Sequence, residues 1–433
     1  MLSNRKRLIR NMVFICTALL ATPMTAIAAS DEEMSEMRAQ IIALAERLDR
    51  LEAENHQLVT ANSELLESHQ QNVEAIAEVS EKTGAAVAEV QQQAEKTNWT
   101  DTIRWKGDFR YRYESFNIEG LPYRHRNRVR ARAALVADIN DNLEVGLGIA
   151  SGGDDPVSSN QTLGGGNSTK DLSMDLAYFD WSGLSGTHII AGKFKNFLHR
   201  SGNNALLWDG DWRPEGSGVN WANNMFFANA VGTWIESDTD KGQTFGYALQ
   251  GGIKFPVGDS LKVTGTVGYY VFDTAGMGSF FGDDDDFFGN SFNPISKTYL
   301  YDYQELELSL DLNFHLFDRP AMIFADFVQN QAVSRNNNAW AAGFTYGTAT
   351  AKGNWALGYV YQRLEADAAF GLLTDSDFGG GGTNAKGHIL KGSYAIAKNW
   401  NANVTYFINQ IGIKKYQDPR DFNRLQLDMS FKY

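Results

Sequence analysis

The stretch "YRHRNRVRARAALVADI", residues 123–139, has an arginine at every second position from Arg124 to Arg132. Residues two apart scatter around the axis of a helix, but they point to the same side of a β-strand. As a strand, the stretch would carry a row of arginines on one face and apolar side chains on the other, namely Val129, Ala131, Ala133, Leu135 and Ala137. Such a strand either binds an anionic partner such as nucleic acid, or it has water on one side and lipid on the other.

The composition of the chain argues against nucleic acid. The 433 residues carry a formal net charge of −13, whereas a nucleic-acid-binding domain is expected to be basic. Beyond the first 30 residues the sequence has no apolar run long enough for a transmembrane helix. A lipid-facing segment in this chain is therefore expected to be a strand.

The first residues have the pattern of a secretory signal peptide. A basic stretch precedes the apolar residues 12–20, and Ala26, Ile27 and Ala28 form an A-x-A cleavage site. We therefore predict a signal peptide over residues 1–28. The single cysteine, Cys16, lies within it, so the mature chain is expected to be exported and free of disulfides.

Residues 29–98 contain a seven-residue apolar repeat. One seam begins Met34, Ile41, Leu48, and the other runs Met37, Leu44, Leu51, Leu58, Leu65. This spacing predicts a helical coiled coil, which weakens after Asn62 where the seam turns polar. A single solvated helix is the alternative. A coiled coil would allow copies of the chain to associate, and we expect a homotrimer.

Residues 99–433 alternate between apolar and polar over segments of about 10–15 residues. In "ELELSLDLNFHL" (305–316), leucines occupy one face and Glu305, Glu307 and Asp311 the other. A soluble β-sandwich also alternates, but here the polar face carries rows of formal charges. Short turns also alternate with the long polar connections 152–170, 274–299 and 366–385. These features predict an all-β fold, an antiparallel transmembrane β-barrel.

Fifteen strands can be recognised from this alternation, whereas bacterial single-chain barrels have an even number. A further short strand within "NNALLWDGDWRPEGSGVNW" (203–221) restores the order of short and long connections. We therefore predict sixteen strands, with fourteen as the alternative. The row of arginines then lies on the water-facing side of one strand, because charges avoid the lipid face.

Several segments resemble the Putative porin family of Gram-negative outer membranes, in which a coiled-coil-like extension can precede the barrel. They are "WTDTIRWKGDFRYRYE" (99–114), "RHRNRVRAR" (124–132), "SSNQTLG" (158–164), "AYFDW" (177–181), "GKFKN" (192–196) and "LLWDGDWRPEG" (206–216). The resemblance implies a passive outer-membrane pore for small hydrophilic solutes and ions. Outer-membrane lipid and lipopolysaccharide would surround the barrel, and the coiled coil would lie in the periplasm.

The candidate pore-lining residues fall into two groups of opposite charge. The cationic group is Arg110, Arg112, Arg124, Arg126, Arg128, Arg130 and Arg132, and the anionic group is Glu305, Glu307, Asp311 and Asp326. In a sixteen-stranded barrel the second and tenth strands lie on opposite walls, so we expect the two groups to face each other across water. Alternatively, the arginines only solvate the lumen and pair with Asp108 and Glu114.

Two acidic clusters lie outside the predicted strands. Asp209, Asp211 and Glu215 belong either to a loop folded into the pore as a constriction or to the extracellular rim. The run Asp283 to Asp286 either binds a divalent cation or is a solvated outer loop, and we favour the loop. We expect no metal site and no cofactor.

Two other functions are alternatives to a pore. An enzyme would need an acid–base or nucleophile constellation, and the seven histidines form none with the neighbouring serines and aspartates. A protein that mainly tethers or spaces the envelope through its coiled coil is the alternative to a pore.

Overall fold

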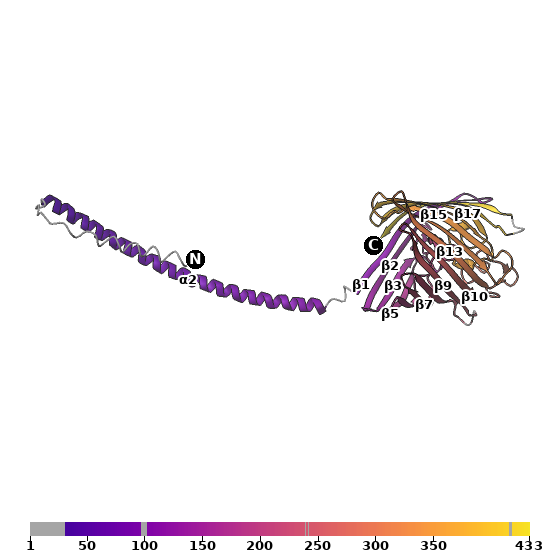
Figure 1. The fold of residues 1–433 in the computed structure, drawn as a ribbon, viewed down its shortest axis with the longest axis horizontal. Helices are drawn as coiled ribbons and strands as arrows, with labels where there is room; N and C mark the ends of the chain where they lie inside the picture. The colour runs from indigo at the N-terminus through magenta and orange to yellow at the C-terminus, as the bar shows by residue number, and fades with distance from the viewer. Residues whose placement is uncertain (1–30, 97–101, 239, 241, 415–417) are drawn as a thin grey trace. The chain divides into compact units, whose positions relative to one another are not determined.

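The computed structural model describes residues 31–96, 102–238, 240, 242–414 and 418–433. The chain divides into two compact units, Met1–Thr97 and Asn98–Tyr433, and each is described by itself (Figure 1). The predicted signal peptide, 1–28, lies outside the described residues.

The first unit contains a single helix, α2 (Asp31–Lys96), of 66 residues. Its seam leucines are largely exposed among the residues that the structure describes: Leu44 is 66% exposed and Leu58 is 68% exposed. The predicted helix is confirmed, whereas the association of helices into a coiled coil stays a prediction. Neither α2 nor any other described helix combines the length and apolar character needed to cross a membrane.

The second unit is a closed antiparallel β-barrel of sixteen strands. The wall consists of β1 (Ile103–Ile118), β2 (Arg124–Asn140), β3 (Leu143–Ser151), β5 (Leu172–Leu184), β6 (Thr187–Lys193), β7 (Glu215–Ala222), β8 (Phe226–Glu236), β9 (Thr244–Val257), β10 (Leu261–Phe272), β13 (Tyr303–Leu316), β14 (Arg319–Asn330), β15 (Asn338–Gly347), β16 (Trp355–Leu364), β17 (Ala385–Ala397), β18 (Trp400–Ile411) and β19 (Arg420–Lys432). Neighbours in the chain pair in order, and β1 pairs with β19 to close the wall. The prediction of sixteen strands is confirmed, and the alternative of fourteen is wrong.

The strand that alternation alone did not reveal is β7. It has eight residues, seven of them within the stretch predicted to contain a hidden strand, and it pairs with β6 and β8. Three shorter pieces, β4 (Gln161–Thr162), β11 (Phe292–Asn293) and β12 (Thr298–Tyr299), lie in long connections outside the count of sixteen. The sequence of β7, EGSGVNWA, has two glycines and few apolar side chains, which explains why alternation did not reveal it and the order of turns was needed.

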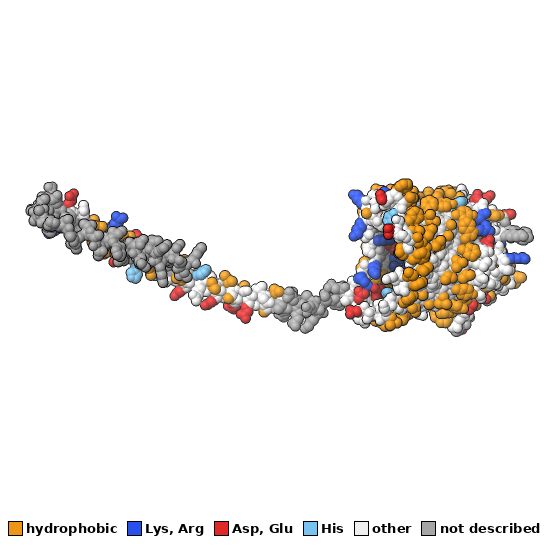
Figure 2. Space-filling view, viewed as in Figure 1, with side chains coloured by type: hydrophobic (Ala, Val, Ile, Leu, Met, Phe, Trp, Pro, Cys, Tyr) orange, Lys and Arg blue, Asp and Glu red, His pale blue; other side chains and the backbone are white. Residues whose placement is uncertain are grey.

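The two faces of the wall separate apolar from charged side chains. On β13, Leu308 and Leu310 are 51% and 42% exposed, whereas Glu307 and Asp311 point inward and are 2% and 4% exposed. Figure 2 shows a belt of apolar side chains around the visible face of the barrel, with charged side chains gathered at its two ends. An apolar outer band of this kind is what a barrel in lipid requires.

The two ends of the barrel differ in their connections. The start of β1 and the end of β19 share one end with tight turns such as 141–142, 185–186 and 398–399. The opposite end carries the long connections 152–171, 194–214, 273–302 and 365–384. We call these the turn end and the loop end. The predicted alternation of short and long connections is confirmed.

We expect arginine to be tolerated on one face of β18 and not on the other. Val404 is 42% exposed on the outer face near the middle of the strand, whereas Asn403 faces inward, where it lines a cavity and is paired in register with Asp428 of β19. Val404→Arg should destabilise folding into lipid by about 2–4 kcal/mol, whereas Asn403→Arg should fold nearly as the parent does. Folding yield in lipid vesicles across a urea series measures both. Equal yields would show that the two faces are assigned incorrectly.

Candidate functional site

The predicted arginine row lies on the inner face of β2 and meets further arginines on β1. The register places Arg110 beside Arg130 and Arg112 beside Arg128. Like charges directly opposite each other on neighbouring strands are destabilising. This part of the wall therefore requires carboxylates nearby.

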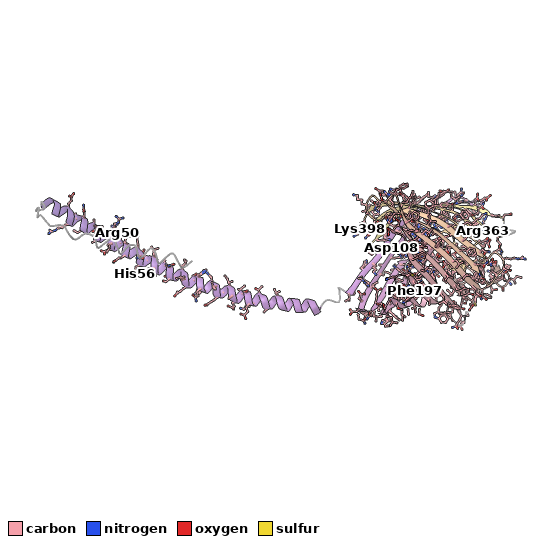
Figure 3. The ribbon with its side chains drawn as sticks, in the orientation of Figure 1. Arg50, His56, Asp108, Phe197, Arg363 and Lys398 are labelled. Carbon is pink, nitrogen blue, oxygen red and sulfur yellow. The ribbon has the colours of Figure 1, made fainter. Side chains whose placement is uncertain are left out.

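Two of these carboxylates come from β1 itself. Glu114 is fully buried; it accepts a hydrogen bond from Arg126 at 2.5 Å and also pairs with Arg424. Asp108, on β1 (Figure 3), pairs with Arg130 and with Arg132, each at 2.8 Å. The alternative that the arginines pair with Asp108 and Glu114 therefore describes part of what the structure shows.

A second set of ion pairs anchors the connection 365–384, which we call the second inward loop. Arg112 binds both oxygens of Asp428 on β19, at 2.7 and 2.8 Å, and also contacts Asp377 of this loop at 3.0 Å. Arg424 reaches the same Asp377 at 2.7 Å. Removing one partner from a buried ion pair costs about 3–5 kcal/mol, because the other charge is left uncompensated. The loop is therefore firmly tied to the wall.

The connection 194–214, the first inward loop, reaches from one wall to the other. At one side its Asp211 contacts Arg132 at 2.8 Å and Arg130 at 3.3 Å, both on β2. At the other side His199 and Ser201 bond to Asp311 of β13, at 2.9 and 2.6 Å. Because β2 and β13 are eight strands apart in a barrel of sixteen, this loop crosses the lumen.

A glycine permits the close approach of this loop to the far wall. Gly202 has a φ of 57°, and its backbone N–H donates to Asp311 at 3.0 Å. A side chain here would overlap the ring of Phe324 on β14. Next to it, the amide of Asn204 donates to Asp326 at 3.0 Å. Two carboxylates of the wall thus receive hydrogen bonds from the loop.

Apolar side chains pack each of the two inward loops against β10. Trp208 stacks on Trp212 with 4.9 Å between ring centroids and meets Tyr270 of β10 edge-on at the same separation. In the second loop, Phe370 packs against Phe272 at 5.2 Å. Burial of these large rings removes much apolar surface from water, which explains why the loops fold inward.

The anionic residues lie on the predicted strands, but they do not face open water as expected. Glu305, Glu307, Asp311 and Asp326 are only 1%, 2%, 4% and 4% exposed. Asp311 and Asp326 are covered by the first inward loop, and Glu305 accepts a hydrogen bond from the backbone of Phe370. Buried carboxylates need such partners, and the loops supply them. The expected arrangement of two charged walls across water is therefore wrong on its anionic side.

The three predicted constriction-loop residues separate in the structure. Asp209 and Asp211 belong to the first inward loop inside the barrel. Glu215 begins β7, where it pairs with Lys193. The run Asp283 to Asp286 is exposed. Within the residues that the structure describes, no group of three or more histidine, cysteine or acidic side chains is placed to hold a metal ion.

Asp209 and Asp211 have opposite electrostatic environments. Burial raises the pKa of Asp209, and the neighbouring carboxylates of Asp375 and Asp211 raise it further. Burial alone would also raise the pKa of Asp211, but Arg130, Arg132 and Arg213 outweigh it and hold this pKa below its usual range. Asp211 is therefore an anion, whereas Asp209 is readily protonated.

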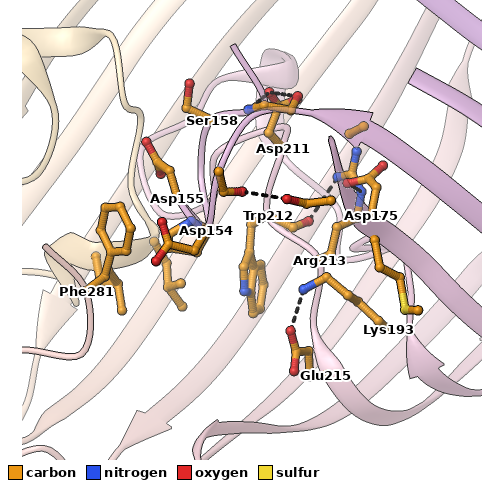
Figure 4. Close-up of a pocket in the computed structure, with 18 of the residues that line it drawn as sticks. Asp154, Asp155, Ser158, Asp175, Lys193, Asp211, Trp212, Arg213, Glu215 and Phe281 are labelled. Carbon is orange, nitrogen blue, oxygen red and sulfur yellow. Dashed lines mark hydrogen bonds and ion pairs between the residues drawn. The ribbon is translucent and has the colours of Figure 1, made fainter. Parts of the chain in front are cut away.

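Two cavities remain beside the inward loops. The cavity at the loop end has a volume of about 460 Å³ and is lined by Trp212, Phe281 and several acidic residues, Asp211 among them (Figure 4). The cavity at the turn end has a volume of about 440 Å³ and is lined by Arg130 and Arg132 together with β17, β18 and β19. Asp211 lines the first cavity and its partners Arg130 and Arg132 line the second, so this cluster of ion pairs lies between the two cavities.

Several residues of this site were missed by reasoning from the sequence. Arg424 belongs to the same alternating pattern as Asp428 on β19, so a full list of inward positions would have included it. Asp377 lies in a loop rich in glycine and aspartate and had no such signal. Its partners Arg112 and Arg424 are 265 and 47 residues away.

Comparison with known proteins identifies the family. The family model described as Putative porin matches residues 118–280 and 287–433. No curated protein sequence matches the chain. The high-pH structure of OprB from Pseudomonas putida is similar in fold, with a TM-score of 0.53 at 13% identity over 78% of this chain and 97% of that one.

Two further structures are similar to the barrel. OmpT of Vibrio cholerae, in a trimer form, has a TM-score of 0.46 at 15% identity and covers 77% of this chain and 99% of its own. A triple mutant of the porin from Rhodopseudomonas blastica has a TM-score of 0.45 at 10% identity over 76% and 100%. The family match covers most of the barrel, and the chain belongs to the Putative porin family of outer-membrane channels.

Proposed function

We propose that the barrel conducts small hydrophilic solutes and ions by passive diffusion, and that the two inward loops set the width of the path. The observation that carries this proposal is the first inward loop, which is bonded to β2 at one side and to β13 at the other. Solutes would pass beside it, from the loop-end cavity to the turn-end cavity, past Asp211 and the arginines it contacts. Neither the family nor the fold supports a mainly tethering role.

The finer features of the proposal rest on the sequence. A signal peptide over 1–28 would direct export, and lipid and lipopolysaccharide would contact the apolar belt. The helix α2 would lie in the periplasm and associate with α2 of other copies through its exposed seam. We propose that the assembly is a homotrimer.

Loosening the second inward loop should change conduction. Asp377→Asn removes the charge that binds Arg112 and Arg424. In planar lipid bilayers the parent protein should give stepwise currents, and the variant should give larger steps with more current noise. Asp284→Asn, in the exposed acidic run, is the matched control and should behave as the parent. A parent protein without steps would contradict the channel, and a variant with unchanged steps would contradict the role of the loop.

Conduction should also depend on pH through Asp209. Folding raises the pKa of Asp209 above the ordinary aspartate value of about 3.9, because the buried site favours the protonated carboxyl. The stabilisation that this gives is complete below the ordinary pKa and is lost as the pH rises through the raised pKa. Ionisation of Asp209 beside Asp375 would push the two inward loops apart. We therefore expect noisier current at pH 9 than at pH 5, and a much smaller pH effect in Asp209→Asn. A pH effect of the same size in that variant would exclude Asp209 as its origin.

The oligomeric state can be tested by removing the helix. The full-length protein should have the mass of a trimer in mild detergent, measured by light scattering with the detergent contribution subtracted. Deletion of residues 31–96 should weaken the trimer, because the exposed seam of α2 is lost. A full-length monomer would contradict the trimer, whereas a trimer that survives the deletion would contradict only the role of the helix.

A further inference from the structure

The turn-end cavity has a marked excess of positive charge. Its lining includes five cationic residues, Arg110, Arg130, Arg132, Lys391 and Lys432, and two carboxylates, Asp108 and Asp428. The neutral part of the lining includes the polar side chains of Ser393, Asn403, Thr405 and Ser430. The cavity therefore offers both charge and hydrogen-bonding groups to a solute.

Both carboxylates of this cavity are already bound to arginines. Asp428 is held by Arg112 through both of its oxygens, at 2.7 and 2.8 Å. Asp108 accepts hydrogen bonds from Arg130 and Arg132, each at 2.8 Å. Neither carboxylate is thus free to neutralise the remaining cations of the lining.

Three cations of the cavity have no carboxylate partner within the part of the chain that the structure describes. They are Arg110, Lys391 and Lys432. Arg110 donates from Nη2 to the side chain of Asn160 at 2.6 Å, and its buried Nε has no partner. Lys391 and Lys432 are exposed to the solvent. A solute could therefore supply the missing negative charges.

These three cations lie on two sides of the cavity. Lys432 is paired in register with Asp108, two residues from Arg110, so β19 and β1 bring these two cations to the same side. Lys391 is on β17, and the order β17, β18, β19, β1 places it three strands from Arg110. Three steps of about 4.8 Å separate the strands by roughly 14 Å, and the register places Lys391 level with Glu114, four residues along β1 from Arg110. The two Cα atoms are therefore roughly 20 Å apart, a gap that the long side chains shorten. An anion with charge at both ends fits this arrangement better than a compact one.

We infer that the turn-end cavity binds small organic anions with two separated carboxylate groups, one held by Arg110 and Lys432 and the other by Lys391. This inference rests on the proposed channel function and adds a solute class to it. An anion with one carboxylate would engage one side only. Inorganic phosphate, whose charges share one centre, would not reach both sides.

Block of single-channel current tests the inference with the full-length protein. Succinate, acetate and inorganic phosphate are compared as blockers in 0.1 M KCl at pH 7. Succinate should block saturably, at a half-blocking concentration at least tenfold lower than that of acetate and clearly lower than that of phosphate. The double variant Lys391→Gln, Lys432→Gln should raise the half-blocking succinate concentration at least fivefold. The double variant Lys262→Gln, Lys297→Gln removes the same charge outside the cavity and should leave it unchanged.

Two results would overturn the inference while leaving the channel intact. In the first, the double variant Lys391→Gln, Lys432→Gln leaves the half-blocking succinate concentration unchanged. In the second, the control double variant raises this concentration as much as the cavity double variant does. Phosphate block as tight as succinate block would overturn the two-sided arrangement. If no current steps appear, the channel function fails instead. Succinate titration by calorimetry in detergent, with the same two double variants, then decides on the cavity separately.

Discussion

The barrel depends on the pairing of β1 with β19. Lipid offers no hydrogen-bonding partners to a backbone, so a sheet in the membrane must have no free edge. Eleven consecutive residues of β1, Asp108 to Ile118, pair with β19 and remove the two free edges that the order of strands would otherwise leave. Every other strand then has two neighbours, and the inner and outer faces follow from strict alternation. The positions of the arginines and of the buried acids are consequences of this closure.

Closure also explains why the charges of the lumen form networks. A closed wall with an apolar outer face directs all of its charged side chains into a confined space, where like charges lie opposite each other on neighbouring strands. Confined charges are stable only when opposite charges and hydrogen bonds surround them. The wall supplies Asp108, Glu114 and Asp428, and the inward loops supply Asp211 and Asp377. The loops therefore complete the electrostatics of the wall as well as narrowing it.

The alternation of apolar and polar residues is sufficient to predict which side chains of each strand point inward and which point outward. Together with the order of short and long connections, it also predicts the number of strands. The arginines of β2 and the leucines of β13 each belong to a period of two, which is a local property of the sequence. The burial of Glu305 and Asp326 could not be predicted in this way. It depends on loop residues such as Phe370 and Asn204, which are 65 and 122 residues distant. Nothing local in a glycine-rich connection shows whether it will extend into solvent or pack inside the wall.

The separation of β1 and β19 along the chain has a consequence for biosynthesis. Arg112 and its partner Asp428 are 316 residues apart. At about 5–20 residues per second, β1 is complete on the order of 15–60 s before its second neighbour is synthesised. During that interval the outer-face aromatic residues of β1, Trp105, Phe109 and Tyr111, have neither lipid nor a closed wall around them. An exposed strand edge with apolar side chains is prone to aggregate. The nascent chain therefore has to be held apart from other chains until its last strand is available.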